Sequence, residues 1–98
     1  MNEQELEKEI QDKGLLAPRI TPDDIDQVIE KETYYNFPDT TVIVCLLTLK
    51  NGFNVIGRSA CASPENFDIS IGSKIARDKA RDKIWELEGY LLKDRLNN

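Results

Sequence analysis

The chain has 98 residues, a formal net charge of -5, 40% hydrophobic residues and 32% charged residues. These values are typical of one globular domain, and the negative charge argues against a surface that binds nucleic acid or anionic membrane over its whole extent. No apolar run has the length of a transmembrane span, and the acidic first ten residues are unlike a signal peptide. We therefore expect a protein of a reducing cytoplasm.

Two short helices are predicted in the first third of the chain. Residues 3–13 form a very polar helical pattern that ends before Gly14, a residue suited to helix termination. Thr21 is a capping hydroxyl, Pro22 suits the first helical position and two acids follow, so a second helix begins here. We expect it to run to about residue 31. Residues 1–14 are interpreted as an acidic helical extension, and residues 15–98 as a single domain.

A β-hairpin is predicted in the middle of the chain. Residues 40–49 are β-branched and apolar on both alternating faces, which predicts a strand covered on both sides, by helices or by a second subunit. Asn51-Gly52 is a strong hairpin signal, and residues 53–60 return as the second strand. A two-residue loop would place Cys45 opposite Arg58, so both cysteines are expected to be free, buried thiols. A third strand from residues 67–71, or completion of the sheet across a homodimer, stays open.

A long helix is predicted at the C-terminal end. After a short helical turn at residues 64–68, Ser70 is a second capping candidate, and no proline follows. One apolar face has helical spacing, with two alanines that allow close packing: Ala76, Ala80, Ile84, Leu87 and Leu91. Gly89 indicates a kink or a close contact with another backbone. The fold class is α+β, in the order α-α-β-β-α, with an antiparallel hairpin packed against the long helix.

The sequence offers little of the equipment of a catalyst. It has no histidine, no glycine-rich phosphate loop and no metal-ligand spacing. We expect no catalytic residues, no metal and no cofactor, and we predict that the protein is not an enzyme. Charge is segregated instead: residues 1–32 hold ten acids and four bases, whereas residues 72–85 hold five bases and two acids. The acidic helices are expected to lie against the basic turns of the last helix, or against those of a neighbour.

The basic segment has a second interpretation. Residues 72–80 read GSKIARDKA after a hairpin, which resembles the C-terminal half of a double-stranded-RNA-binding domain, whose lysines at the helix start reach phosphates. The nucleic-acid contacts would then be Lys74, Arg77, Arg81 and Lys83. Only two predicted strands precede this helix, and two aspartates interrupt its basic face. A salt-bridged, solvated helix surface is therefore the stronger interpretation.

Several motifs in the C-terminal half are shared with phage proteins. Asn66-Phe67-Asp68, Ile71-Gly72, Ile75-Ala76 and the run WELEGYLL at residues 85–92 resemble a functionally uncharacterised family of small tailed-phage and prophage proteins, over about residues 17–96. The resemblance implies a phage gene product in the cytoplasm of a bacterial host cell. It supplies no catalytic residues.

Our first hypothesis is a non-enzymatic accessory protein that binds and modulates or inhibits a host protein, such as a defence or nucleic-acid-handling factor. Its partner would present a basic surface to a set of acids with two aromatic anchors: Glu3, Glu5, Glu7, Glu9, Asp23, Asp24, Asp26, Trp85 and Tyr90. The alternatives are a small nucleic-acid-binding module and a virion assembly accessory protein.

Overall fold

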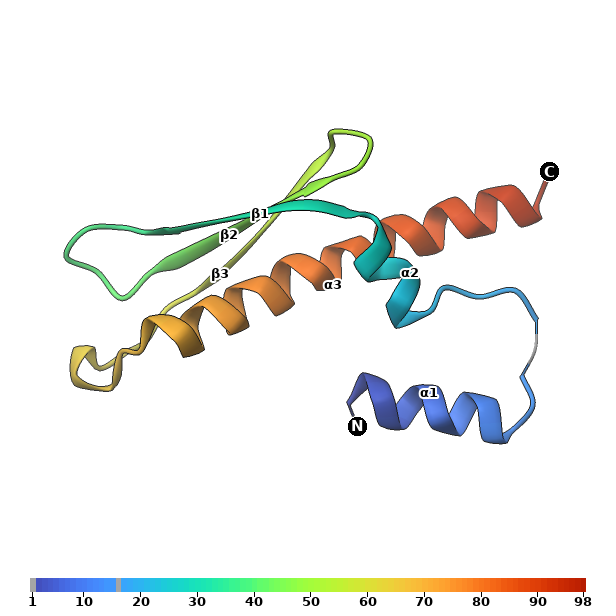
Figure 1. The fold of residues 1–98 in the computed structure, drawn as a ribbon, viewed down its shortest axis with the longest axis horizontal. Helices are drawn as coiled ribbons and strands as arrows, with labels where there is room; N and C mark the ends of the chain where they lie inside the picture. Colours follow the sequence, from blue (N-terminus) through green and yellow to red (C-terminus); the bar gives the residue numbers. More distant parts are fainter. Residues whose placement is uncertain (1, 16) are drawn as a thin grey trace.

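The computed structural model describes residues 2–15 and 17–98. The chain forms α1 (Glu3–Asp12), α2 (Pro22–Gln27), β1 (Ile29–Asn36), β2 (Ile43–Leu49), β3 (Asn54–Ser59), the short 3-10 helix η1 (Pro64–Asn66) and α3 (Ile69–Leu96) (Figure 1). The predicted α+β class, with an antiparallel hairpin packed against a long C-terminal helix, is confirmed. Both predicted starts in the first third are also found, because Asn2 caps α1 and Thr21 forms a capping box with Asp24 at α2.

The sheet has a third strand, for which the sequence left two sources open: residues 67–71 or a second subunit. Strand β1 pairs antiparallel with β2, and β2 with β3, in the order β1-β2-β3. The prediction of helix up to residue 31 is wrong, because α2 ends at Gln27 and the Val28 carbonyl accepts a hydrogen bond of 3.0 Å from the Lys50 amide. That bond joins the chain to the end of β2. Thr33, Tyr34 and Tyr35 then continue as strand, as β-branched and aromatic residues favour. Residues 67–71 are not a strand: Phe67 and Asp68 precede α3, and residues 69–71 are its first turn.

The predicted hairpin at Asn51-Gly52 exists, but its loop is one residue longer. The Leu49 amide donates a hydrogen bond of 2.8 Å to the Phe53 carbonyl, and Gly52 has a φ of 90°. This is the three-residue turn in which the last position needs a left-handed residue. The strand register consequently shifts, and Cys45 lies opposite Gly57 rather than Arg58. Both cysteines are free, as expected; Cys45 is buried, whereas Cys61 is only partly buried.

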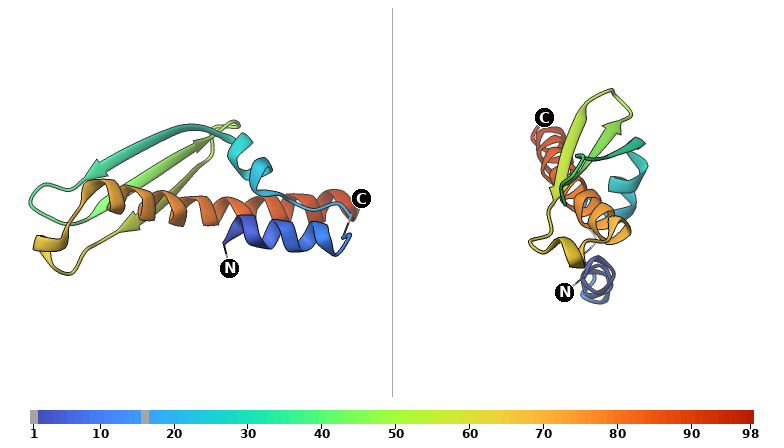
Figure 2. Two further views of the ribbon diagram at one scale, coloured as in Figure 1. Left: turned by 60° about the horizontal axis from the view of Figure 1, so that its bottom comes forward. Right: turned by 90° about the vertical axis from the view of Figure 1, so that its left-hand side faces the viewer.

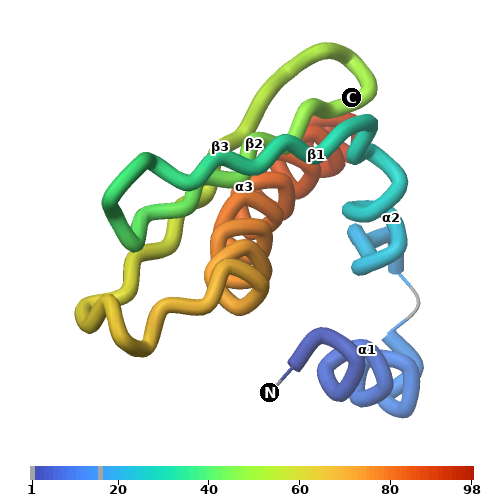
Figure 3. The backbone as a smooth tube through the Cα atoms, turned by 60° about the vertical axis from the view of Figure 1, so that its left-hand side comes forward, coloured from blue at the N-terminus to red at the C-terminus, as the bar shows by residue number. Residues whose placement is uncertain are grey.

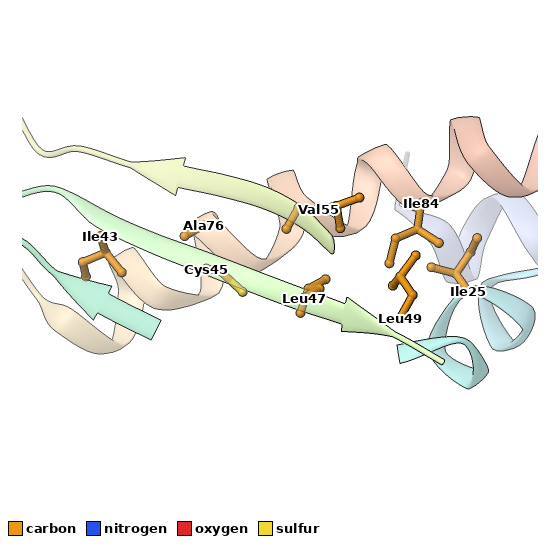
Figure 4. Close-up of a cluster of buried hydrophobic side chains, with 9 residues drawn as sticks. Ile25, Ile43, Cys45, Leu47, Leu49, Val55, Ala76 and Ile84 are labelled. Carbon is orange, nitrogen blue, oxygen red and sulfur yellow. The ribbon is translucent and has the colours of Figure 1, made fainter. Parts of the chain in front are cut away.

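The core is one layer of side chains between the sheet and α3 (Figures 2 and 4). Alternate residues of β2 point into this layer. Strand β3 approaches α3 closely at Gly57, because a Cβ atom there would be 2.2 Å from the Ala76 carbonyl oxygen and the Ala80 nitrogen. Only a glycine in the strand and alanines in the helix allow such contact. The core residues are Ile25, Ile43, Cys45, Leu47, Leu49, Val55, Ala76, Ala80 and Ile84.

In the part of the chain that the structure describes, helices cover only one face of the sheet. Helix α3 packs beneath β2 and β3 and reaches β1 through the Arg77–Glu32 ion pair. Helix α2 packs beside it through Ile25, and α1 lies on the far side of α3 from the sheet (Figures 2 and 3). The expectation that helices would cover both faces is therefore wrong. Covering of the second face by another subunit stays a prediction.

Helix α3 begins and continues differently from expectation. Its cap is Asp68, not Ser70, since the Asp68 carboxylate accepts a hydrogen bond of 3.0 Å from the Ile71 amide. The helix extends past the sheet, so that Leu91 on the predicted apolar face is exposed. No close backbone contact is found at Gly89: nothing described lies within 4 Å of the position of a Cβ atom there.

Candidate interaction surfaces

Arg81 of α3 joins three helices. Its Nε donates to Asp26 of α2 at 2.9 Å, Nη2 donates to the Pro22 carbonyl at 3.1 Å, and Nη1 donates to the Glu3 carboxylate of α1. Trp85, one turn further, donates its indole N–H to the same Glu3 oxygen at 3.2 Å. The Arg81 side chain is 10% exposed. Burial lowers its pKa, but the hydrogen bonds that Arg81 donates to Glu3 and Asp26, with the negative charges of both, outweigh burial and raise the pKa overall. The guanidinium is thus permanently charged and its direction is fixed.

Two further ion pairs connect segments that are distant in sequence. Arg77 of α3 donates to Glu32 of β1 at 3.0 Å, and Arg19 donates to Glu7 of α1. The Arg19 hydrogen bond lowers the pKa of Glu7. At Glu32, partial burial raises the pKa, but hydrogen bonds from Tyr34 and Arg77 outweigh it and lower the pKa overall. The predicted contact between the acidic segment and the basic turns of the last helix is found within one chain.

These ion pairs combine residues that were assigned to competing sites. Glu3 and Asp26 were expected to face a basic partner, and Arg81 to face nucleic acid; they contact one another instead. Arg77, the other arginine of the nucleic-acid set, is paired with Glu32. Part of the charge segregation is therefore an internal contact, which joins Glu3, Asp26 and Glu32 to Arg77 and Arg81.

The other predicted site residues are spread over the molecule. On α1, Glu9 pairs with Lys13 while the Glu5 side chain is exposed. On α2, Asp24 caps the helix and Asp23 accepts from Gln27. On α3, Lys74 is exposed, Lys83 donates to the Ile56 carbonyl at the outer edge of β3, and Tyr90 is 75% exposed. The two proposed aromatic anchors are not adjacent, because Trp85 packs against the core and Tyr90 lies beside Phe53 and Leu91 in a shallow hollow.

The uncovered side of the sheet is a surface whose full extent was not predicted from the sequence. The pairing places three rows of residues across the strands, and the central strand contributes half-buried side chains while its neighbours are exposed. We call this surface the open sheet face. Each of its rows has one residue from β1, β2 and β3 in that order: Lys31–Thr48–Asn54, Thr33–Leu46–Ile56 and Tyr35–Val44–Arg58.

The open sheet face is apolar in the middle and basic at its ends. Ile56 is 49% exposed and Tyr35 is 53% exposed. Tyr35 packs edge-on against Phe37, with the ring centroids 4.9 Å apart. Lys31 and Arg58 supply two positive charges, and none of the nine residues is acidic. Antiparallel sheets commonly leave one face to water, but that face is usually polar, so an apolar strip here is suited to a contact.

The sequence interpretation missed this face because it missed β1. Tyr35 lies beside Val44, and Thr33 beside Leu46, because of the register in which β1 pairs with β2. The continuous apolar run of β2 was a usable signal, since it correctly showed that the second face of the strand is also apolar. Across residues 2–15 and 17–98, no three or more acids and cysteines gather in an arrangement that could hold a metal ion.

The fold and these surfaces define a small α+β protein, in which a three-stranded antiparallel sheet has helices on one face and an apolar second face. The model of the phage protein (N4 Gp49/phage Sf6 gene 66) family matches residues 20–96, and the chain belongs to this phage protein family. Helix α1 lies outside the matched residues. No curated protein and no solved structure is significantly similar to the chain. No described helix is long and apolar enough to cross a membrane.

Proposed function

We propose that this phage protein is a non-enzymatic binding protein, which attaches to a host protein in the bacterial cytoplasm and modulates or inhibits it. The observation that carries the proposal is the open sheet face. Scattered exposed apolar residues are normal on any protein, but contiguous apolar side chains on neighbouring strands mark contact surfaces. Here Tyr35 and Val44 form one cross-strand pair and Leu46 and Ile56 form another.

A protein partner suits this face better than a nucleic acid. The aliphatic side chains of Val44, Leu46 and Ile56 form its centre, and aliphatic groups give little of the stacking that bases require. Two cations, Lys31 and Arg58, flank that centre. The complementary partner therefore presents apolar side chains bordered by carboxylates. This differs from the basic partner that the acidic helices suggested, because several of those acids are already paired.

The test is affinity capture from host-cell lysate with two matched variants. Ile56→Lys places a charge in the centre of the open sheet face, whereas Ile75→Lys makes the same change at a similarly exposed position of α3. We expect the wild type and Ile75→Lys to capture one host protein in stoichiometric amount, even after nuclease treatment of the lysate. Ile56→Lys should no longer capture it. Circular dichroism checks that both variants fold. Equal capture by both variants would remove the open sheet face from the proposal.

One observation favours a second candidate, the nucleic-acid-binding module. Strand β1 supplies the third strand before α3 that the resemblance to a double-stranded-RNA-binding domain lacked. Against it, Arg77 and Arg81 are held by carboxylates, which leaves Lys74 and Lys83 of the four cations. Fluorescence anisotropy with duplex RNA, duplex DNA and single strands at low salt separates the candidates. Binding that weakens steeply with salt would favour this second function.

A further inference from the structure

Helix α1 is attached to the rest of the protein mainly by polar contacts. None of its residues is buried, and its central Leu6 is about half exposed. Its links across the chain are Glu3 to Arg81 and Trp85, and Glu7 to Arg19. Ion pairs near the surface contribute little to stability, and a ten-residue helix is marginal by itself. The attachment of α1 is therefore weak compared with that of the other helices.

The groups beneath Glu3 form a site that does not depend on α1. Arg81 and Trp85 direct two N–H groups from successive turns of α3 onto one carboxylate oxygen. Asp26 and the Pro22 carbonyl hold the other guanidinium nitrogens of Arg81. Trp85 is positioned by its packing against the core. Both donors would keep their directions without Glu3, and such preorganisation lowers the cost of binding a carboxylate.

The charges around this site restrict what it can bind. A shallow polar depression is lined by Glu3, Asp26, Arg77, Asp78, Arg81 and Asp82. Without Glu3, two guanidinium groups face three carboxylates. The three acids repel anions in general, and a nucleic-acid backbone most of all. A single carboxylate can bind only where it contacts the Arg81 and Trp85 donors directly, as Glu3 does. The present occupant, Glu3, comes from the first turn of a helix.

We propose that α1 is a displaceable cover, and that the Arg81–Trp85 site beneath it binds a carboxylate on a helical segment of a partner protein. Glu3 occupies the position that the partner's carboxylate takes. This site is separate from the open sheet face, because α1 lies on the opposite side of α3 from the sheet (Figure 2). The Arg81–Trp85 site can therefore be tested independently of the open sheet face.

The test uses the full chain and a synthetic peptide with the sequence of residues 2–13, which includes all of α1. Trp85 is the only tryptophan of the chain, and the peptide contains none, so tryptophan fluorescence reports on the site alone. We expect the Glu3→Gln chain to bind the peptide about tenfold more tightly than the wild type, because its own carboxylate no longer competes. A peptide that carries the same Glu3→Gln change should lose this binding.

Glu5→Gln is the matched control chain, since Glu5 lies on the same helix, its side chain is exposed and the change in charge is equal. We expect Glu5→Gln to behave like the wild type. Hydrogen exchange of the wild type gives a second measurement, in which the amides of α1 exchange at least about 100-fold faster than those of β2. Equal peptide affinity in the Glu3→Gln and Glu5→Gln chains, or equal protection of α1 and β2, would overturn the proposal.

Discussion

Gly57 of β3 and Ala80 of α3 lie so close together that a Cβ atom on Gly57 would be 2.2 Å from the Ala80 backbone nitrogen. The atoms in the way belong to the helix backbone, which cannot move aside as a flexible side chain can. The distance between sheet and helix is thus set at this point, and the core layer on either side of it depends on that distance.

Replacement of Gly57 by alanine should therefore destabilise the fold. We expect Gly57→Ala to lower the free energy of unfolding by about 3 kcal/mol, because the sheet and α3 must separate. Gly89→Ala is the matched control: nothing described lies near its Cβ position, and alanine is favoured in a helix interior, so stability should rise by up to about 1 kcal/mol. Urea unfolding of both variants measures the two changes.

A second prediction concerns the arginine that joins the helices. Arg81→Met keeps much of the side-chain volume but removes the hydrogen bonds to Asp26, Glu3 and Pro22. We expect a loss of about 1–2 kcal/mol in the free energy of unfolding. Arg77→Met removes a more exposed pair with Glu32, and should cost less than about 1 kcal/mol. An equal loss in both variants would show that Arg81 holds the helices together no more firmly than an ordinary surface pair.

The lowered pKa values of Glu7 and Glu32 predict loss of stability in acid. A carboxyl group whose pKa is lower in the folded than in the unfolded state contributes stability above its unfolded pKa, and this contribution disappears as the pH falls. We expect the free energy of unfolding to decline between about pH 5 and about pH 3. Glu32→Gln should decline less steeply than the wild type when urea unfolding is repeated across this range.

The two cysteines should differ in reactivity. Burial raises the pKa of Cys45 and keeps its thiol protonated, while Cys61 is partly exposed near the start of α3. Because the thiolate is the reactive form, we expect a disulfide reagent to modify Cys61 in the native protein at least about 100-fold faster than Cys45. In the Cys61→Ser variant the fast phase should vanish. In that variant, unfolding by denaturant should expose the Cys45 thiol and make it react with the reagent.

Local signals in the sequence were sufficient for the starts of α1 and α2, the position of the Asn51-Gly52 turn and the buried part of the apolar face of α3. Thr21 and Gly14 act at helix ends through contacts within a few residues, so their neighbours in sequence contain the needed information. The close packing at Ala76 and Ala80 was likewise predicted, because small residues let a helix lie close to what it covers.

Strand β1 and the long-range ion pairs could not be predicted from local sequence patterns. The segment IEKETYYN is charged and lies directly after a well-capped helix, so its local pattern did not predict a strand. It becomes one because β2 offers an edge to pair with. Glu32 and Arg77 are 45 residues apart in sequence, and Arg81 and Glu3 are 78 residues apart. Such contacts depend on how distant elements pack against one another, and local patterns do not contain that information.

The length of α3 has a practical consequence for the placement of labels. At about 1.5 Å per residue, 28 residues form a rod about 42 Å long, and its last turns point away from the sheet (Figure 1). An affinity tag or fluorophore joined after Asn98 would extend from the distal end of this rod. It would leave both the open sheet face and the Arg81–Trp85 site accessible, whereas the same label before α1 would interfere with the cover itself.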